Sequence, residues 1–572
     1  MNGEILNIIL LFLVTVMLAY PLGIYMSKVY QGEKNLLDLA GGLERMIFLV
    51  SGIDPKRSMD WKEFLKAMLT INLLWLVYGM LLLIFQDRLP LNPDGNAGQT
   101  PDLAFNTVIS FLVNCDLQHY SGESGLTYLT QLLVVTFLQF ASAATGMACV
   151  VALFNGMKEK SSAQLGNFWN YFVKSITRIL LPLSLVLAII LVINGTPASF
   201  AGADRITTIE GDTVQVARGP AAGMIAIKQL GTNGGGWFGV NSAHPFENPN
   251  YFTNAAETIA ILLIPIALLF TLGHYINRRR LALVIFGVMT ILFVAFCCLT
   301  VWFESRGNPA LQRLGIAQQH GSLEGKEVRI GSAATAFWAV ATTSTSNGSV
   351  NGMHDSLTPI SGGVLMLDMM INALYGGVGV GLLNYFIFII IAVFISGLMV
   401  GRTPEFMGHK VEAREIKIAA LVTLLSAFLI KGFTALAAYL YVHHPGLAWN
   451  VPPSAWLNNP SYHGFSEMLY EYTSANANNG SGFEGLGDNN VFWNVTTGVV
   501  LLLGRFLPII APVAIIGMLA RKKQVPPSPG TLRIDSVTFG LMTMAVILIV
   551  TALSYLPALA LGPLAEYFSL YH

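Results

Sequence analysis

Ten apolar runs recur along this chain, and each is long enough to cross a bilayer as a helix, which takes about 20 residues. The runs cover residues 5–25, 67–86, 127–153, 177–195, 256–276, 281–302, 376–400, 418–442, 493–520 and 536–560. Only 11% of the 572 residues are charged, about half the fraction usual in soluble domains, so a soluble fold is excluded. Because only Glu4 precedes the first run and no basic segment does, we expect this run to be retained. The sequence therefore predicts an all-α integral membrane protein with about ten transmembrane helices.

The basic residues between the runs predict the orientation. Cytoplasmic loops of membrane proteins are enriched in Lys and Arg. Most of the 32 basic residues lie in the first, third, fifth, seventh and ninth connections, for example Arg278, Arg279 and Arg280 in the fifth. We therefore expect the odd connections to face the cytoplasm and both termini to lie outside.

Four stretches rich in glycine or asparagine lie in the outward-facing, even connections. They read Asn114-Cys115-Asp116-Leu117-Gln118, Gly231-Thr232-Asn233-Gly234-Gly235-Gly236, Thr343-Ser344-Thr345-Ser346-Asn347-Gly348 and Asn476-Ala477-Asn478-Asn479-Gly480. Irregular backbone at membrane depth is tolerated only where protein buries it or where it lines a watery cavity. Four such stretches can ring one pore, because glycine lets successive carbonyls turn toward an axis and a carbonyl ring can replace the water shell of a monovalent cation. This pattern predicts a filter of the potassium type.

The four stretches also predict an internal repeat. Gln118, Gly234, Gly348 and Gly480 recur at similar intervals, which is typical of repeated units. Before each stretch lies a semi-apolar segment too short to cross a bilayer, at 103–114, 220–230, 333–343 and 465–475. The carbonyl ends of such half-helices carry partial negative charge and favour a cation. The alternative, ordinary loops with glycine turns, does not explain four stretches at matching positions.

We expect four pore repeats of span, pore helix and span around a central pore, with one extra helix at each end. The expected segments are 1–66 with the first helix and a cytoplasmic connection, 67–176, 177–280, 281–417 and 418–520 as pore repeats one to four, and 521–572 with the last helix.

Several other functions find little support in the sequence. The second glycine-rich stretch lacks the Lys-Ser/Thr ending of a phosphate-binding loop, and no Asp-Lys-Thr-Gly sequence is present, so we expect no ATP hydrolysis, no catalytic residues and no organic cofactor. His244 with Glu247, and His354 with Asp355, lack a third convergent ligand, so hydrogen-bonded braces are favoured over metal sites. A net charge of zero gives no case for nucleic acid.

Charged residues within or beside apolar runs need a reason, because each is costly in hydrocarbon unless paired or hydrated. Asp368, Lys431 and Arg505 are such residues, and both pairing within the bundle and a role along an ion path are open. Arg505 is the strongest functional candidate because it lies well inside the ninth run. Its fixed positive charge below a filter would repel cations and block a straight leak.

Motifs along essentially the whole chain resemble the potassium-binding A subunits of bacterial potassium-transporting ATPases, the KdpA family in the superfamily of K⁺ transporters. The motifs are Asn114 to Glu123 (NCDLQHYSGE), Leu230 to Pro249 (LGTNGGGWFGVNSAHPFENP), Met353 to Ser356 (MHDS), Gly401 to Glu405 (GRTPE), Asn478 to Ser481, Gly504 to Phe506 and Pro557 to Pro563. The resemblance implies a K⁺ uptake subunit in the bacterial inner membrane that selects K⁺ from outside. It also implies an intramembrane tunnel to a separate P-type ATPase, the B subunit, with the C and F subunits completing the complex.

By the same resemblance, the filter residues are Asn114, Gln118, Thr232, Asn233, Gly234, Ser346, Asn347, Gly348, Asn478, Asn479 and Gly480, and Arg505 and Asp116 lie on the gating path. The chain departs from better-known members at Cys115 and Asp116, where they have Thr and Asn, and at Asn347, where they often have Cys. A carboxylate at Asp116 near the entrance puts a copied affinity or selectivity in doubt.

Two other functions are alternatives to this one. The first is a stand-alone, channel-like K⁺ transporter driven by the ion gradient, against which the two extra spans, the GRTPE connection and Arg505 argue. The second is a membrane-embedded enzyme using His244 or His354, for which the sequence shows no convergent cluster.

Overall fold

The computed structural model describes residues 2–35, 37–158, 162–399, 401–447, 449–524 and 533–571. Within these residues, ten helical segments are long and apolar enough to cross a membrane. They are Gly3–Gln31, Trp61–Ile84, Tyr128–Lys158, Phe168–Ile193, Tyr251–Tyr275, Arg279–Arg313, Val380–Met399, Ala413–His443, Val491–Ala520 and Val537–Leu570. The prediction of an all-α membrane protein with ten spans is confirmed. The predicted limits at 1, 400 and 572 lie outside the described residues.

Eight of these segments form four units, each with a short helix between two spans, which confirms the predicted architecture. The first unit contains α3 (Trp61–Ile84), α4 (Pro101–Leu112) and α7 (Phe137–Lys158), and the second contains α8 (Phe168–Ser175) with α9 (Leu181–Ile193), α10 (Ala221–Leu230) and α11 (Tyr251–Tyr275). The third unit contains α12 (Arg279–Arg306), α14 (Ser332–Ser344) and α16 (Val380–Met399). The fourth unit contains α17 (Ala413–His443), α18 (Tyr462–Ala477) and α19 (Val491–Ala520). The short helices α4, α10, α14 and α18 fall where half-helices were predicted.

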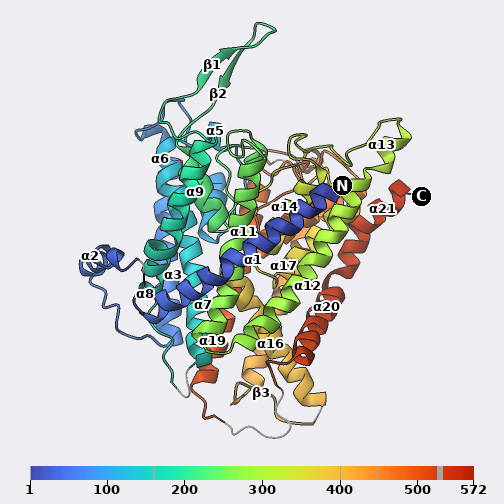
Figure 1. Cartoon of the computed structure of the whole chain (residues 1–572). Coiled ribbons are helices and arrows are strands. Elements are labelled where there is room, and N and C mark those ends of the chain that lie inside the picture. The colour runs from blue at the N-terminus through green and yellow to red at the C-terminus, as the bar shows by residue number, and fades with distance from the viewer. Residues whose placement is uncertain are drawn as a thin grey trace.

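The two extra helices lie on the outside of the bundle. α1 (Asn2–Gln31) runs diagonally across α11 in Figure 1 and packs along it. The backbones approach closely at Gly23, where a Cβ would lie 2.6 Å from the carbonyl oxygen of Ala267. Small residues permit such contacts between membrane helices. α20 (Val537–Leu559) packs against α12, α15 and α16.

The second span of the third unit is broken, which the sequence analysis missed. The chain forms α15 (Pro359–Ile371), then an irregular stretch at 372–379, and only then α16. Three residues of the stretch have positive φ: Asn372 (44°), Gly376 (59°) and Gly379 (88°). A helix cannot continue through left-handed residues. The span predicted at 376–400 therefore begins inside this irregular stretch.

The remaining elements are short helices, turns and strands, and the π-helical turns among them lie within three of the spans. They are α2 (Gly41–Ser51), α5 (Gly122–Gly125), α6 (Tyr128–Thr130), α13 (Pro309–Arg313), α21 (Ala565–Tyr571), strands β1 (Asp204–Thr207) with β2 (Thr213–Val216) and β3 (Glu405–Phe406) with β4 (His409–Lys410), π-helical turns at Gln131–Thr136, Ile176–Leu180 and Ala560–Leu564, and 3₁₀ turns at Asp38–Ala40, Gln86–Arg88, Asn241–Ala243 and Pro453–Ala455.

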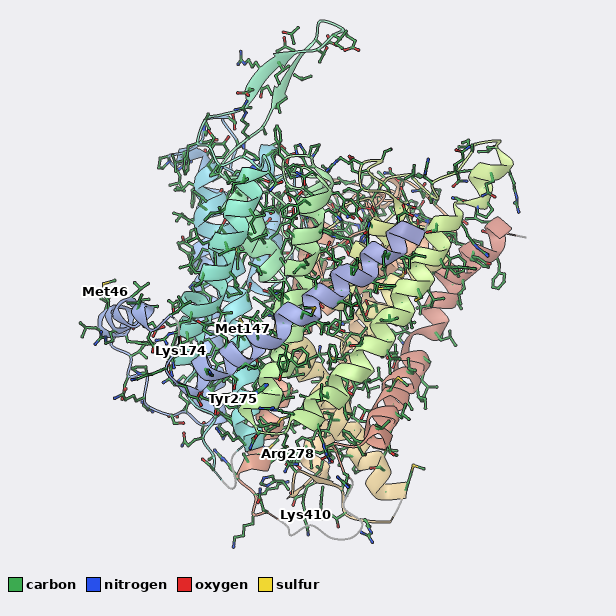
Figure 2. The ribbon with its side chains drawn as sticks, viewed as in Figure 1. Met46, Met147, Lys174, Tyr275, Arg278 and Lys410 are labelled. Carbon is green, nitrogen blue, oxygen red and sulfur yellow. The ribbon has the colours of Figure 1, made fainter. Side chains whose placement is uncertain are left out.

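The two ends of the bundle carry different parts of the chain. The antiparallel hairpin β1–β2 projects from one end, and α1 begins and α21 ends at that same end (Figure 1). Figure 2 shows Arg278 and Lys410 at the opposite end. The start of α1, the end of α21 and the β1–β2 hairpin therefore lie opposite these two basic residues of the odd connections.

Candidate functional site

The four short helices end in the same turn. The second residue after α4, α10 and α14, and the first after α18, has a left-handed backbone: Asn114 (φ 61°), Thr232 (48°), Ser346 (48°) and Asn478 (52°). The N–H of the following residue donates to the carbonyl five residues earlier, in the pairs Cys115 to Ser110 (3.0 Å), Asn233 to Lys228 (3.1 Å), Asn347 to Thr342 (2.8 Å) and Asn479 to Ser474 (2.9 Å). The four turns are therefore equivalent in backbone geometry.

This equivalence corrects the predicted register of the first unit. The residue after each donor is Asp116, Gly234, Gly348 or Gly480. Gln118 was expected to match the three glycines, but Asp116 occupies that position. The three glycines have φ values of 79°, 92° and 109°, in the region that favours glycine. Asp116 has no positive φ, so a side chain is tolerated there.

The glycines let neighbouring turns touch through their backbones. A Cβ on Gly234 would lie 1.9 Å from the carbonyl oxygen of Asn347, and one on Gly348 would lie 2.1 Å from that of Asn479. A Cβ on Gly480 would lie 2.6 Å from the backbone oxygen of Asp116. These contacts join the second turn to the third, the third to the fourth and the fourth to the first.

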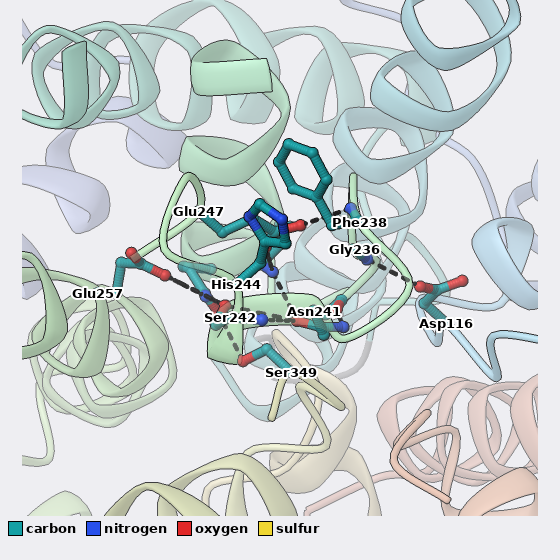
Figure 3. Close-up of polar contacts among 12 residues, drawn as sticks. Asp116, Gly236, Phe238, Asn241, Ser242, His244, Glu247, Glu257 and Ser349 are labelled. Atoms are coloured by element: carbon teal, nitrogen blue, oxygen red, sulfur yellow. Dashed lines mark hydrogen bonds and ion pairs between the residues drawn. The ribbon is translucent and has the colours of Figure 1, made fainter. Parts of the chain in front are cut away.

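The ring closes between the first and second turns through a side chain. Asp116 Oδ2 accepts a hydrogen bond from the N–H of Gly236 at 3.1 Å (Figure 3). Asp116 is buried, and its other oxygen, Oδ1, has no hydrogen-bond partner among the described residues. Oδ2 therefore links the first turn to the second, while Oδ1 is available to a ligand.

Asparagine side chains hold the turns together from behind. Their amides donate to backbone carbonyls of the neighbouring unit, in the pairs Asn114 to Thr232 (2.7 Å), Asn233 to Phe111 (3.1 Å), Asn347 to Lys228 (3.0 Å) and Asn479 to Thr342 (2.8 Å). In the first unit, Cys115 occupies the position equivalent to Asn233, Asn347 and Asn479, and its side chain has no amide group. Because these amide groups are already hydrogen-bonded, they hold the turns in place. Most of the remaining oxygen atoms at the ring belong to backbone carbonyls of the turns.

Gln118 supports the second turn rather than aligning with the glycines. Its Oε1 accepts from the N–H of Gly236 at 3.2 Å, and its Nε2 donates to the carbonyl of Phe238 at 3.2 Å. The predicted filter residues of the four units are thus brought together, with Gln118 two residues beyond the equivalent position.

A fully buried ion pair supports the second turn, and the sequence analysis missed it. Lys228 on α10 contacts Glu247 and donates to Asn241 Oδ1 at 2.6 Å. Glu247 also accepts from the N–H of Phe238 at 2.9 Å (Figure 3). A buried charge is costly unless it is paired. The sequence signal for this ion pair was a lysine within a short, mostly apolar helix.

The two histidines weighed as metal or acid/base groups contact different neighbours. His244 stacks on Phe238 with ring centres 3.8 Å apart, and its Nδ1 accepts from the N–H of Phe246 at 3.0 Å. His354 Nδ1 lies 3.0 Å from the hydroxyl of Tyr470. Both therefore brace loops beside the ring.

Arg505 lies below the ring without an acidic partner among the described residues. Its side chain is buried, and Nη2 donates weakly to the carbonyl of Ser142 at 3.4 Å. Nη1 lies 3.3 Å from the point where a Cβ on Gly377 would stand, in the irregular stretch 372–379. The same stretch reaches the second turn, because Val378 N–H donates to Thr232 Oγ1 at 2.9 Å. A positive charge and a broken helix therefore meet beneath the ring.

Of the other two charged residues singled out, one is buried and one is not. Asp368 accepts from the hydroxyls of Thr343 (2.8 Å) and Ser344 (2.6 Å) at the end of α14, and its Oδ1 has no partner among the described residues. Lys431 is exposed on α17. Only Asp368 lies near the ring.

A cavity of about 50 Å³ lies beside the break in the third unit. Its polar lining comes from Asn372, Asn384, Asn476, Thr423, Ser426, Thr551 and Ser554, and Met370, Ile371, Ile387, Phe388, Val422, Pro508, Val550 and Tyr555 complete it. It is bounded by α15, α16, α17, α18, α19 and α20.

The chain is similar to one family along almost its whole length. The family described as "Potassium-transporting ATPase A subunit" matches residues 9–568. Proteins named "Potassium-transporting ATPase potassium-binding subunit" are 60% identical in Flavobacterium johnsoniae and 59% in Phocaeicola vulgatus, over 100% of both chains in each case. One from Alicyclobacillus acidocaldarius is 47% identical over 98% of both chains.

A solved structure shares the fold. The potassium transporter TrkH from Vibrio parahaemolyticus matches with a TM-score of 0.51 and 13% sequence identity, over 89% of this chain and 98% of that one. At this identity the likeness concerns the arrangement of helices alone.

Proposed function

Because this chain belongs to the family of potassium-transporting ATPase A subunits, we propose that it is the potassium-selective subunit of an ATP-driven K⁺ uptake pump. The subunit does not hydrolyse ATP itself. It lies in a bacterial inner membrane with both termini outside, so the ring of turns meets ions from the outer side. The observation that carries this proposal is the closed ring of four equivalent turns.

K⁺ is bound by the ring, mainly through backbone carbonyls. The left-handed residue and the two after it form the lining in each unit: Asn114 to Asp116, Thr232 to Gly234, Ser346 to Gly348 and Asn478 to Gly480. Carbonyl rings suit a monovalent cation that sheds its water. The paired asparagine amides keep the carbonyls at fixed spacing, and Gln118 holds the second turn in register.

Asp116 sets this ring apart from one built of carbonyls alone. Its unpartnered Oδ1 adds a carboxylate where the other three units have glycine. A nearby negative charge strengthens cation binding through Coulomb attraction, and more strongly when water is excluded. We expect the affinity for K⁺ to depend on this residue.

The ion leaves the ring sideways. Arg505 places beneath the ring a positive charge that has no acidic partner within the described part of the chain, and this charge opposes a straight path to the cytoplasm. The polar cavity between α16, α17 and α20 offers a lateral route toward a separate P-type ATPase, the B subunit, and the C and F subunits complete the complex. Replacing Arg505 by alanine should open a leak, measured as passive rubidium flux into liposomes. Flux equal to that of the unchanged protein would contradict the role of Arg505.

A second candidate is a channel-like K⁺ transporter driven by the ion gradient, and the fold it shares with TrkH favours it. The two candidates differ in whether transport needs ATP. Tagged protein purified from its own host's membranes separates them. The pump subunit brings an ATPase whose hydrolysis is stimulated by K⁺ and not by Na⁺, whereas the channel-like transporter purifies alone and passes rubidium without ATP.

A further inference from the structure

Three metal-ligating side chains converge outside the ring, from segments far apart in the sequence. They are Asp355 in the loop before α15, and His463 and Glu467 on α18, and one ligand atom from each lies within 4.8 Å of the other two. His463 and Glu467 are one helical turn apart and therefore share a face of α18. His463 Nε2 lies 2.9 Å from Asp355 Oδ1.

The two carboxylates are held side by side. Asn459 Nδ2 donates to Asp355 Oδ2 at 3.3 Å and to Glu467 Oε1 at 3.2 Å. Gly485 makes room for both, because a Cβ there would lie 2.3 Å from Glu467 Oε1 and 2.8 Å from Asp355 Oδ2. Two ionised carboxylates this close repel each other, and a cation bound between them relieves that repulsion.

Glu467 lacks a partner for one of its oxygens. Its residue is 0% exposed, and Oε2 makes no hydrogen bond within the described part of the chain. A buried carboxylate oxygen without a partner is expensive, since the water it loses on folding is not replaced. Glu467 is fixed in the cluster through Oε1, and a cation bound to this carboxylate would also satisfy its unpartnered oxygen.

His463 is oriented as metal-binding histidines usually are. Its Nδ1 lies 2.8 Å from Glu566 Oε1 at the start of α21, while Nε2 faces the cluster. A carboxylate on the second ring nitrogen fixes the tautomer and the direction of the ring in most metal sites. The ring also stacks on Phe483, with centres 5.7 Å apart and planes 10° apart.

We propose that Asp355, His463 and Glu467 bind one divalent cation of the zinc type on the outer side of the protein. A set of one imidazole and two carboxylates suits Zn²⁺, which takes nitrogen and oxygen ligands, better than Ca²⁺ or Mg²⁺, which take oxygen. When the cation binds, the proton that His463 Nε2 shares with Asp355 Oδ1 is released to solvent, and Nε2 and the carboxylate then bind the metal. Water completes the coordination.

The cation would join three parts of the outer surface. Asp355 belongs to the loop that follows the third turn of the ring, and His463 and Glu467 belong to the helix that carries the fourth turn. Glu566 on α21 contacts His463 and so connects α21 to that helix. A ligand that binds only the folded protein stabilises it by mass action. External zinc should therefore stabilise the outer mouth without being transported.

The experiment uses the full-length chain, purified in detergent, stripped with a chelator and dialysed against Zn²⁺. We expect one tightly bound equivalent of zinc, a rise in the thermal unfolding temperature, and X-ray absorption showing nitrogen and oxygen ligands at about 2.0–2.2 Å. Ca²⁺ and Mg²⁺ at equal concentration should give a smaller rise. These three measurements are made on the unchanged chain and do not depend on any variant.

Two variants then locate the site, and one serves as a control. Glu467→Gln and His463→Gln should each lose the bound equivalent and the thermal shift. His320→Gln, which changes an exposed outer histidine, should keep both. An unchanged chain that binds no zinc, so that only water fills the site, would overturn the proposal. Retention of the bound equivalent in both cluster variants would overturn it as well.

Discussion

Replacing Gly234 by alanine adds one methyl group and should weaken K⁺ binding more than the same replacement at a glycine with open space around it. The Cβ of alanine would stand 1.9 Å from the carbonyl oxygen of Asn347, whereas carbon atoms normally approach no closer than about 3.4 Å. The second and third turns must therefore separate by about 1.5 Å. Alanine at a φ of 79° adds a backbone penalty of about 1–2 kcal/mol, and overpacking adds about 1–3 kcal/mol.

We expect Gly234→Ala to weaken K⁺ binding by about tenfold to a hundredfold, because every 1.4 kcal/mol of the strain that falls on the bound state costs a factor of ten. Isothermal titration of the purified chain with K⁺ measures this. Gly234→Asp, which adds a charge to the same clash, should bind more weakly still.

Gly223→Ala is the matched control on the same short helix. No atom lies within 4 Å of the position that its Cβ would take, so its K⁺ affinity should equal that of the unchanged chain. The reasoning is refuted if Gly234→Ala folds and binds K⁺ as tightly as the control. In that case the ring of turns is not the ion site.

The remaining predictions concern the groups around the ring. Gln118→Arg should weaken K⁺ uptake while the complex still assembles, which uptake assays and co-purification check; unchanged affinity would remove Gln118 from the site. Glu247→Gln leaves Lys228 buried without its counter-charge and should destabilise the fold by about 3–5 kcal/mol, seen as a lower unfolding temperature. Burial lowers the pKa of His119, but Asp488 and neighbouring hydrogen bonds outweigh it and raise the pKa to about 9. Because the folded pKa is raised, up to about 3 kcal/mol of stability present below pH 6.5 should be lost as pH rises through 9. His119→Gln should flatten that dependence, and an unchanged pH profile would contradict it.

Length and hydropathy were sufficient to predict the spans and the short helices. A membrane helix must be apolar over its whole length, so its signal is local in the sequence. The four turns were also visible, because glycine and asparagine mark left-handed backbone wherever they occur. These signals need no knowledge of which residues meet in space.

The register of the first unit could not be read in the same way. Asp116 stands where the other units have glycine, and Gln118 was matched in its place because no local rule distinguishes them. Only the repeated hydrogen bond, from Cys115 back to Ser110 in this unit, shows the equivalence. The break between α15 and α16 was missed because Asn372 and the glycines after it sit between two apolar segments.

Contacts between distant segments were outside the reach of the sequence. Lys228 and Glu247 are separated by the second turn, and their pairing depends on how that turn folds back. Asp355 was weighed only with its neighbour His354, although its actual partner, His463, lies in the next unit. Such pairs are set by the packing of the units against one another.

The most direct test of the account is made on tagged protein purified from its own host's membranes. The account predicts that a P-type ATPase accompanies the chain, and that K⁺ at low concentration, but not Na⁺, stimulates ATP hydrolysis. A chain that purifies alone and passes rubidium into liposomes without ATP would contradict the pump and leave a channel-like transporter.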